Sequence, residues 1–151
     1  MESNKKWKTI SQEYVVRSPF INLRKDSCIT DEQEEIDGYY VCEFPNWVNI
    51  VAVTAENEVI FVREYRYAID EVTVAIPAGK VDDNEKESDA AARELKEETG
   101  FFSKDDLVLL GSFYTNAANA TNKVFTYLAT NVEQIAEPER ALGEKTEVVK
   151  M

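Results

Sequence analysis

The chain has 151 residues, of which 44% are hydrophobic, and it carries 29 Asp and Glu against 17 Lys and Arg, for a net charge of −12. This length and composition fit one globular domain, and the acidic balance argues against a nucleic-acid partner, which requires a basic surface. The chain has no histidine, which excludes histidine general bases and histidine-ligated zinc. No apolar run approaches the roughly 18 residues of a membrane span, and the N-terminus is polar, so we expect a soluble, cytoplasmic protein without a membrane partner.

Most of the chain has the residue patterns of β-strands. Runs rich in β-branched and aromatic residues are separated by turn residues, such as Ser18 with Pro19 and Pro45 with Asn46. The two runs on either side of residues 56–58 predict a β-hairpin. The predicted strands are residues 8–17, 20–29, 36–44, 47–55, 59–65, 72–76, 107–115, 123–130 and 144–151.

One segment has the pattern of a helix. Residues 89–99 contain mostly strong helix formers, Ser88 precedes them as the predicted N-cap, and Gly100 follows them as the predicted C-terminal stop. At about 100° per residue, four charged residues share one broad face, namely Arg93, Glu94, Glu97 and Glu98. Small and apolar residues share the opposite face, which we expect to pack on a sheet: Ser88, Ala91, Ala92, Leu95 and Thr99.

The charged face brings three carboxylates close together. Glu94 lies within about one turn of both Glu97 and Glu98, and like charges at this spacing destabilise a helix. Arg93 lies four residues before Glu97 and offsets part of this repulsion. The remaining negative charge suits a hard cation, and magnesium typically takes one or two carboxylates together with water and substrate phosphates.

The helix is part of a longer pattern in residues 79–101. Seven residues stand at fixed intervals in it: Gly79, Glu85, Arg93, Glu94, Glu97, Glu98 and Gly100. A solvated acidic helix would not require Gly79 or Glu85. The pattern resembles the Nudix box with every fixed position filled. The resemblance implies an α/β/α sandwich with a mixed sheet, in which the box forms a loop–helix–loop, and a pyrophosphohydrolase that uses Mg²⁺, with Mn²⁺ as an alternative.

Residues 61–81 resemble one branch of that family. The triplet Glu64-Tyr65-Arg66 and the entry at residues 75–79 are similar to the segment before the box in ADP-ribose pyrophosphatases and related nucleoside-diphosphate-sugar hydrolases. This resemblance implies that residues 1–151 form a single Nudix domain. It also implies that residues 1–45 supply N-terminal antiparallel strands that build a homodimer. The fold usually ends with a second long helix, and the sequence stops at Met151, so we expect that this helix is either absent or removed by truncation.

The resemblance implies roles for the box residues. Glu94, Glu97, Glu98 and the backbone carbonyl of Ala78 would hold metal ions, and Arg93 would orient the carboxylates. The general base would be Glu97 or a later residue in the loop before the last strand. The supporting positions of the box are Gly79, Glu85 and Gly100.

Residues outside the box complete the expected site. Arg66 would contact a substrate phosphate, for which a guanidinium fork is well suited. Glu144 would assist a metal or activate water, and Glu147 competes for this role. The amides of Asn116, Asn119 and Asn122 could bind a sugar or base, or could simply form turns. An aromatic side chain could stack on the base, although most aromatics at strand spacing belong to a core; the candidates are Tyr14, Phe20, Tyr39, Tyr40 and Trp47.

Two departures from the branch bear on the substrate. Ala75 stands where the branch often has Glu, and residues 112–123 lack the proline that the branch often has there. These two departures argue against ADP-ribose as the particular substrate, but they do not affect the expected class of substrate, the nucleoside diphosphate sugars. The main hypothesis is therefore hydrolysis of a nucleoside diphosphate sugar, such as ADP-ribose, to two monophosphates. The alternatives are a Nudix hydrolase of nucleoside triphosphates or dinucleoside polyphosphates, and a non-catalytic sensor of nucleotide sugars.

Overall fold

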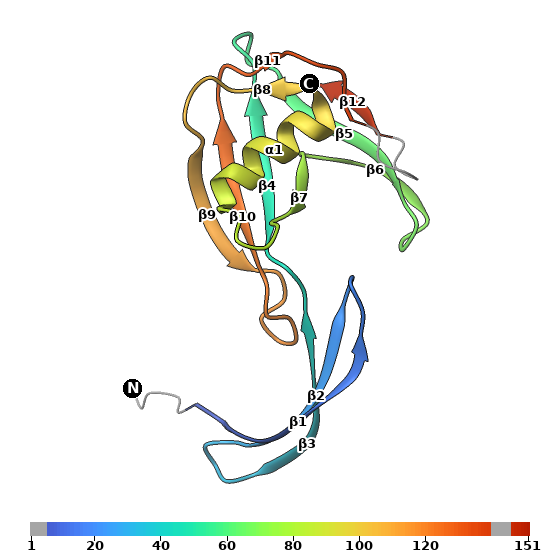
Figure 1. Cartoon of the computed structure of the whole chain (residues 1–151), viewed down its shortest axis with the longest axis vertical. Helices are drawn as coiled ribbons and strands as arrows, with labels where there is room; N and C mark the ends of the chain where they lie inside the picture. The colour runs from blue at the N-terminus through green and yellow to red at the C-terminus, as the bar shows by residue number, and fades with distance from the viewer. Residues whose placement is uncertain (1–5, 140–145) are drawn as a thin grey trace. The chain divides into compact units, whose positions relative to one another are not determined.

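The computed structural model describes residues 6–139 and 146–151, and the chain divides into two compact units. One unit comprises residues 1–44 and 114–122, and the other comprises residues 45–113 and 123–151. Each unit has a β-sheet of its own (Figure 1).

The first unit contains a three-stranded antiparallel sheet of order β1-β2-β3. Its strands are β1 (Lys8–Arg17), β2 (Asn22–Ile29) and β3 (Glu35–Glu43). Ser18 closes the turn between β1 and β2, because its hydroxyl accepts hydrogen bonds from the backbone N–H groups of Phe20 at 3.2 Å and Ile21 at 3.0 Å. The prediction of antiparallel N-terminal strands is confirmed.

The second unit contains a seven-stranded mixed sheet. Five strands follow the order β12-β5-β4-β10-β9, while β6 pairs with β5 and β7 pairs with β4. Strand β10 runs parallel to β4, whereas β5 and β7 run antiparallel to it. The bounds are β4 (Trp47–Val53), β5 (Val59–Arg66), β6 (Glu71–Ala75), β7 (Ala78–Lys80), β9 (Val108–Tyr114), β10 (Lys123–Ala129) and β12 (Glu147–Lys150). The predicted hairpin corresponds to β4 and β5.

The core of this unit follows the two-residue period of its strands. On β4, Val48, Ile50 and Ala52 are fully buried, and on β5 Ile60 and Val62 are buried in the same way. Alternate residues of a strand point to the same face of a sheet, so these rows form one continuous apolar surface. Helix α1 (Glu87–Thr99) covers this surface (Figure 1).

Helix α1 approaches the sheet closely because its buried residues are mostly small: Ala90, Ala91, Leu95 and Thr99. Its N-cap is Lys86, without a side-chain cap, so the predicted N-cap at Ser88 is wrong. The helix begins earlier because Glu87 and Asp89 both lie in its first turn, where the helix dipole favours negative charge. The predicted stop is confirmed, since Gly100 has a φ of 73° and donates its N–H to the carbonyl of Lys96 at 2.8 Å.

Three short strands were not expected from the sequence. They are β7 (Ala78–Lys80), β8 (Phe101–Phe102) and β11 (Glu133–Gln134). Strands of two or three residues are too short to display an alternating pattern, so only their tertiary pairing defines them. Strand β8 pairs with β11 in a small antiparallel sheet of its own.

The described residues contain one α-helix, so they show one helical layer of the expected sandwich. The last strand, β12, pairs antiparallel with β5. Within residues 6–139 and 146–151, no helix is long and apolar enough to cross a membrane.

Replacing Gly100 with Ala should destabilise the second unit. The positive φ disfavours any residue with a Cβ, and a Cβ there would lie 2.0 Å from the carbonyl oxygen of Ala136. We expect the free energy of unfolding to fall by roughly 2–4 kcal/mol, measured by urea denaturation.

Gly111→Ala is the matched control. A Cβ at Gly111 would meet the ring of Phe113 at 3.1 Å, and a side chain can shift where a backbone carbonyl cannot. We expect a loss below about 1 kcal/mol. Equal losses for the two variants would contradict the role assigned to Gly100.

Candidate active site

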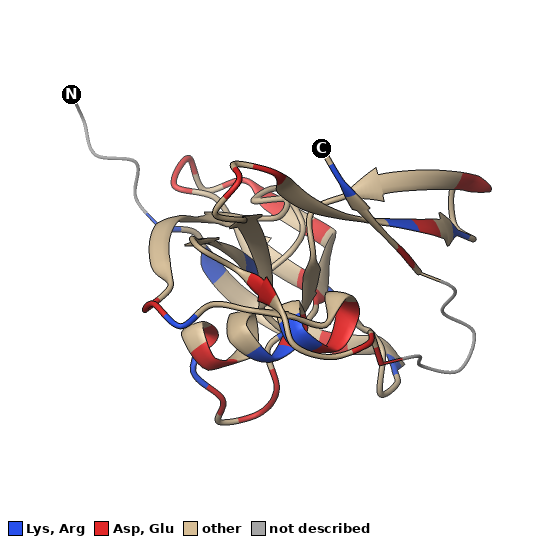
Figure 2. Cartoon of the chain, turned by 90° about the horizontal axis from the view of Figure 1, so that it is seen from above, with Lys and Arg blue, Asp and Glu red and all other residues tan. Residues whose placement is uncertain are grey.

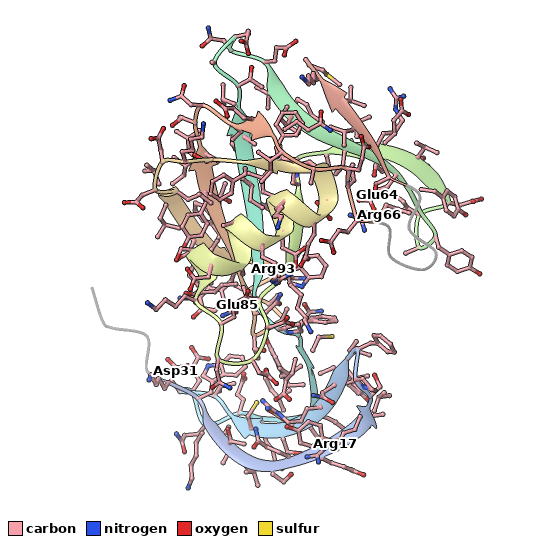
Figure 3. The ribbon with its side chains drawn as sticks, turned by 45° about the horizontal axis from the view of Figure 1, so that its top comes forward. Arg17, Asp31, Glu64, Arg66, Glu85 and Arg93 are labelled. Atoms are coloured by element: carbon pink, nitrogen blue, oxygen red, sulfur yellow. The ribbon has the colours of Figure 1, made fainter. Side chains whose placement is uncertain are left out.

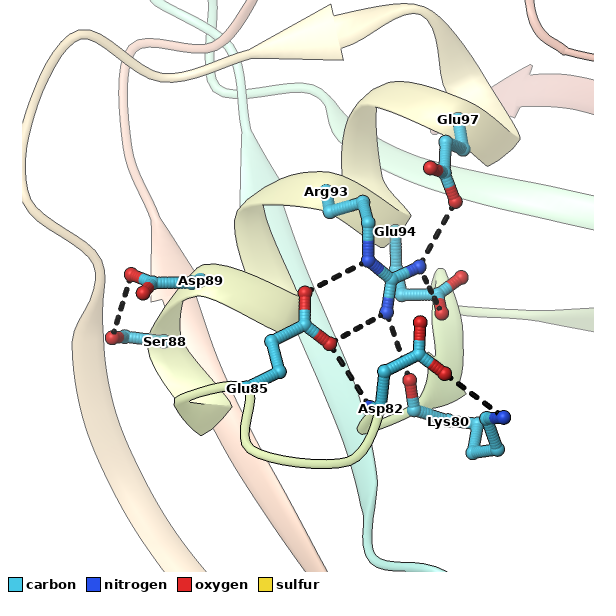
Figure 4. Close-up of polar contacts among 8 residues, drawn as sticks. All are labelled: Lys80, Asp82, Glu85, Ser88, Asp89, Arg93, Glu94 and Glu97. Atoms are coloured by element: carbon cyan, nitrogen blue, oxygen red, sulfur yellow. Dashed lines mark hydrogen bonds and ion pairs between the residues drawn. The ribbon is translucent and has the colours of Figure 1, made fainter.

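Arg93, in the middle of helix α1, is the centre of a polar network that extends from the loop before the helix to Glu97 (Figure 4). Its Nε and Nη2 donate to the two carboxylate oxygens of Glu85, each at 2.9 Å. Its Nη1 donates to Glu94 at 2.7 Å and to Glu97 at 3.0 Å, and Nη2 also donates to the backbone carbonyl of Lys80 at 2.9 Å. One guanidinium therefore holds three carboxylates and ties strand β7 to the helix.

Glu85 fixes the loop that leads into α1. Besides its two bonds with Arg93, its Oε2 accepts the backbone N–H of Asp82 at 3.0 Å. The Arg93 guanidinium and this N–H group lower the pKa of Glu85 to about 2, because both favour the ionised carboxylate. The same network raises the pKa of Arg93, chiefly through its hydrogen bonds with Glu85.

Glu98 lies at the other side of the helix face, next to strand β7. Its Oε2 accepts the backbone N–H of Ala78 at 3.0 Å. The pKa of Glu98 is raised to about 7, chiefly by burial and also by the charges of Glu94 and Glu64, while the Ala78 N–H and Arg66 oppose the shift. A carboxylate with this pKa is poorly solvated, and a cation beside it would stabilise its ionised form.

Gly79 explains why the helix and β7 can approach so closely. A Cβ at this position would lie 2.0 Å from the carboxylate carbon of Glu94. Burial also raises the pKa of Glu94, with Arg93 opposing the shift. The requirement for Gly at position 79 is therefore steric, because any side chain would displace this carboxylate.

These elements surround a cavity of about 390 Å³ in the second unit. Six residues predicted from the sequence line it: Arg66, Ala78, Gly79, Glu94, Glu97 and Glu98. Trp47, one of the aromatic candidates, also lines it. Acidic residues outnumber basic ones both in the loop before α1 and along the helix (Figure 2).

Other predicted residues lie elsewhere. Asn116, Asn119 and Asn122 belong to the first unit, and Glu144 lies outside the described residues. Glu147 lies on β12, where it forms an ion pair with Arg63 at 3.0 Å. The asparagines take part in turns: Asn116 Oδ1 accepts the N–H of Ala118 at 3.2 Å, and Asn122 Oδ1 accepts the hydroxyl of Thr115 at 2.7 Å.

Three charged residues of the cavity were not predicted: Glu64, Lys80 and Glu139. Glu64 and Arg66 lie beside each other on β5 (Figure 3). The sequence did contain a signal for Glu64, because it follows Ile60 and Val62 at the two-residue spacing of a buried strand face. A charged residue in such a row is unusual.

Comparison with known proteins places the chain in a family. The NUDIX domain profile matches residues 44–151, and the chain belongs to the NUDIX family. Residues 7–41 match the nucleoside diphosphate sugar hydrolase N-terminal domain. The family, the mixed α/β fold and the enzyme class expected from residues 61–101 are thereby confirmed.

Individual relatives are similar over most of the chain. The ADP-ribose pyrophosphatase of Bacillus subtilis is 31% identical over 137 residues, which cover 91% of this chain and 72% of the relative. The methanol dehydrogenase activator of Bacillus methanolicus is 29% identical over 136 residues, covering 90% and 71%. A crystal structure of an ADP compounds hydrolase has the same fold, with a TM-score of 0.83 and 23% identity over 99% of this chain and 80% of the other.

Replacing Glu85 with Gln tests the network around Arg93. Because the folded state lowers the pKa of Glu85 from 4.5 to about 2, the ionised carboxylate stabilises the fold above pH 4.5, and this stabilisation is lost as the pH falls toward 2. We expect the variant to be less stable than the parent by roughly 1–2 kcal/mol at neutral pH. The difference should shrink as the pH falls toward 2, measured by urea unfolding across this range.

Asp83→Asn is the control, since it neutralises an exposed carboxylate of the same loop. Its unfolding free energy should stay close to that of the parent throughout the pH range. A Glu85→Gln difference that stays constant from pH 7 to pH 2 would show that the ion pair is not its source.

Proposed function

We propose that this chain hydrolyses the pyrophosphate bond of a nucleoside diphosphate sugar, such as ADP-ribose, to two monophosphates. The observation that carries the proposal is the set of box carboxylates on the wall of a cavity that also contains Arg66. The cavity has the size of a small-molecule site. The relatives named ADP-ribose pyrophosphatase and ADP compounds hydrolase support this class of substrate.

NUDIX hydrolases generally use divalent metals, and the residues of this cavity fit Mg²⁺. Glu94, Glu97, Glu98 and the carbonyl of Ala78 are hard oxygen donors on neighbouring elements. Within the described residues, these carboxylates are not gathered into a ready-made group of three metal ligands. An open set of this kind suits Mg²⁺, which keeps several waters and binds substrate phosphates. When bound, the metal polarises phosphoryl oxygens and acidifies water; Mn²⁺ is the alternative.

The proposed roles of the side chains follow from their positions. Arg66, whose side chain is about half exposed at 47%, reaches the cavity and can bind a phosphate with its guanidinium fork. Arg93 orients Glu94 and Glu97 through hydrogen bonds. Glu97 is partly exposed, so it can take a proton from an attacking water; Glu144 is the other proposed base.

We further propose that residues 1–151 act as one NUDIX hydrolase domain in the cytoplasm, as a homodimer formed through residues 1–45. Strand β1 supports this proposal, because each of its residues is exposed and several are large and apolar. A strand with such a surface is suited to an interface with another copy of the chain.

Carboxylate substitutions test the reaction directly. The parent is incubated with Mg²⁺ and a panel of ADP-ribose, GDP-mannose, UDP-glucose, dinucleoside polyphosphates and nucleoside triphosphates. We expect one sugar diphosphate to yield two monophosphates. Glu98→Gln and Glu94→Gln should each lower kcat/KM by more than about 100-fold, because loss of outer-shell partners of a metal ligand already costs about 10–100-fold.

Asp89→Asn on the same helix is the matched control, since Asp89 is exposed and lies outside the cavity. It should retain the activity of the parent. Full turnover by Glu98→Gln and Glu94→Gln would contradict the proposed site, and release of inorganic pyrophosphate from a triphosphate alone would favour the alternative substrate class.

A further inference from the structure

Glu64 is a buried carboxylate that the proposed reaction does not use. It follows Ile60 and Val62 in the inward-facing row of β5, and it is 8% exposed. Burying a carboxylate is costly unless hydrogen bonds or opposite charges compensate for the lost water. The position of Glu64 therefore calls for a partner.

The described residues leave one oxygen of Glu64 without a hydrogen-bond donor. Among the buried side-chain atoms of residues 6–139 and 146–151, Glu64 Oε1 alone has no hydrogen-bond partner. Arg66 Nη2 forms an ion pair with this oxygen, but the pair does not meet the geometry of a hydrogen bond. Glu64 also lines the cavity, so a ligand there can supply the missing donor.

The chemistry of that donor is restricted by the neighbours of Glu64. The Arg66 guanidinium already places a positive charge beside Oε1, and a carboxylate oxygen has acceptor capacity for more than one donor, so a neutral hydroxyl suits Oε1 better than a further cation. Arg66 lies next to it and is the proposed phosphate ligand. The partner of Glu64 should therefore carry a hydroxyl within a few bonds of a phosphate.

Sugar diphosphates and triphosphates differ at this point. A nucleoside diphosphate sugar presents sugar hydroxyls beside its second phosphate, and these can donate to a carboxylate. A nucleoside triphosphate has ribose hydroxyls only beside its α-phosphate. Beyond its β-phosphate it presents ionised oxygens, which donate nothing and are repelled by a buried negative charge.

We propose that Glu64 is a specificity-determining residue that accepts a hydrogen bond from a sugar hydroxyl and repels a terminal phosphate. This proposal rests on the proposed function and names the side chain that selects its substrate class. Arg66 binds a phosphate that nucleoside diphosphate sugars and nucleoside triphosphates both possess, so Arg66 cannot distinguish them. Glu64 is the residue that distinguishes these two classes of ligand.

Two variants separate the two parts of this role. Glu64→Gln removes the charge and keeps an acceptor oxygen, so we expect the affinity for ATP to rise relative to ADP-ribose by about 10-fold or more. Glu64→Leu also removes the acceptor, so kcat/KM for ADP-ribose should fall by about 10- to 100-fold, the range that a hydrogen bond to a charged group spans. The ratio of the two ligands cancels any common effect of a displaced Arg66.

The experiment measures dissociation constants for ADP-ribose and ATP in EDTA, and turnover of both in Mg²⁺. Glu71→Gln, which neutralises an exposed carboxylate on the adjacent strand β6, should leave the ratio unchanged. Circular dichroism and thermal unfolding confirm that each variant is folded.

The outcomes distinguish the two proposals. Turnover of ADP-ribose by the parent, with an unchanged ATP to ADP-ribose ratio in Glu64→Gln, overturns the role of Glu64 alone. A changed binding ratio without turnover of any sugar diphosphate by the parent supports Glu64 and overturns the proposed function. Absence of both binding and turnover in the parent overturns both proposals.

Discussion

The hydrogen-bonded group around Arg93 is the interaction on which the rest of the site depends. Helix α1 carries Glu94, Glu97 and Glu98 within two turns, and such a face is unfavourable in isolation. Arg93 compensates for this repulsion, and its contacts with Glu85 and the Lys80 carbonyl join three segments of the chain. The positions of the carboxylates are therefore set before any cation or substrate enters, which limits the reorganisation that binding requires.

The close packing of α1 on the sheet places the remaining parts. Small residues on the buried face bring the helix near to β7, and Gly79 leaves room for the Glu94 carboxylate. Ala78 then lies within hydrogen-bonding distance of Glu98. Across the cavity, β5 contributes Glu64 and Arg66 from a rigid strand rather than a loop. The proposed roles in substrate selection and in catalysis thus fall to different elements of one sheet–helix unit.

The features that can be predicted from the sequence are those that short-range interactions along the chain determine. Periodicity and local spacing predicted the nine longer strands, the single helix, its stop at Gly100 and the Arg93–Glu97 pair, which are determined within a few residues of the chain. The contact of Arg93 with Lys80 and the strand β7 depend on tertiary pairing, which no local pattern reveals. The N-cap was misplaced because Ser88 has the preferred side chain, whereas the charges of the first turn extend the helix to Glu87.

The parallel pairing of β4 with β10 has a consequence for how the chain folds. Asn46, just before β4, accepts a hydrogen bond from the N–H of Lys123 at the start of β10, and the two residues are 77 positions apart. Contacts of such long range form slowly, because the intervening chain must first be ordered. During synthesis the local β1–β3 meander can form early, while β4 waits for most of the chain to emerge. Until then β4 lacks its parallel neighbour, and its apolar row of Val48, Ile50 and Ala52 needs protection from aggregation.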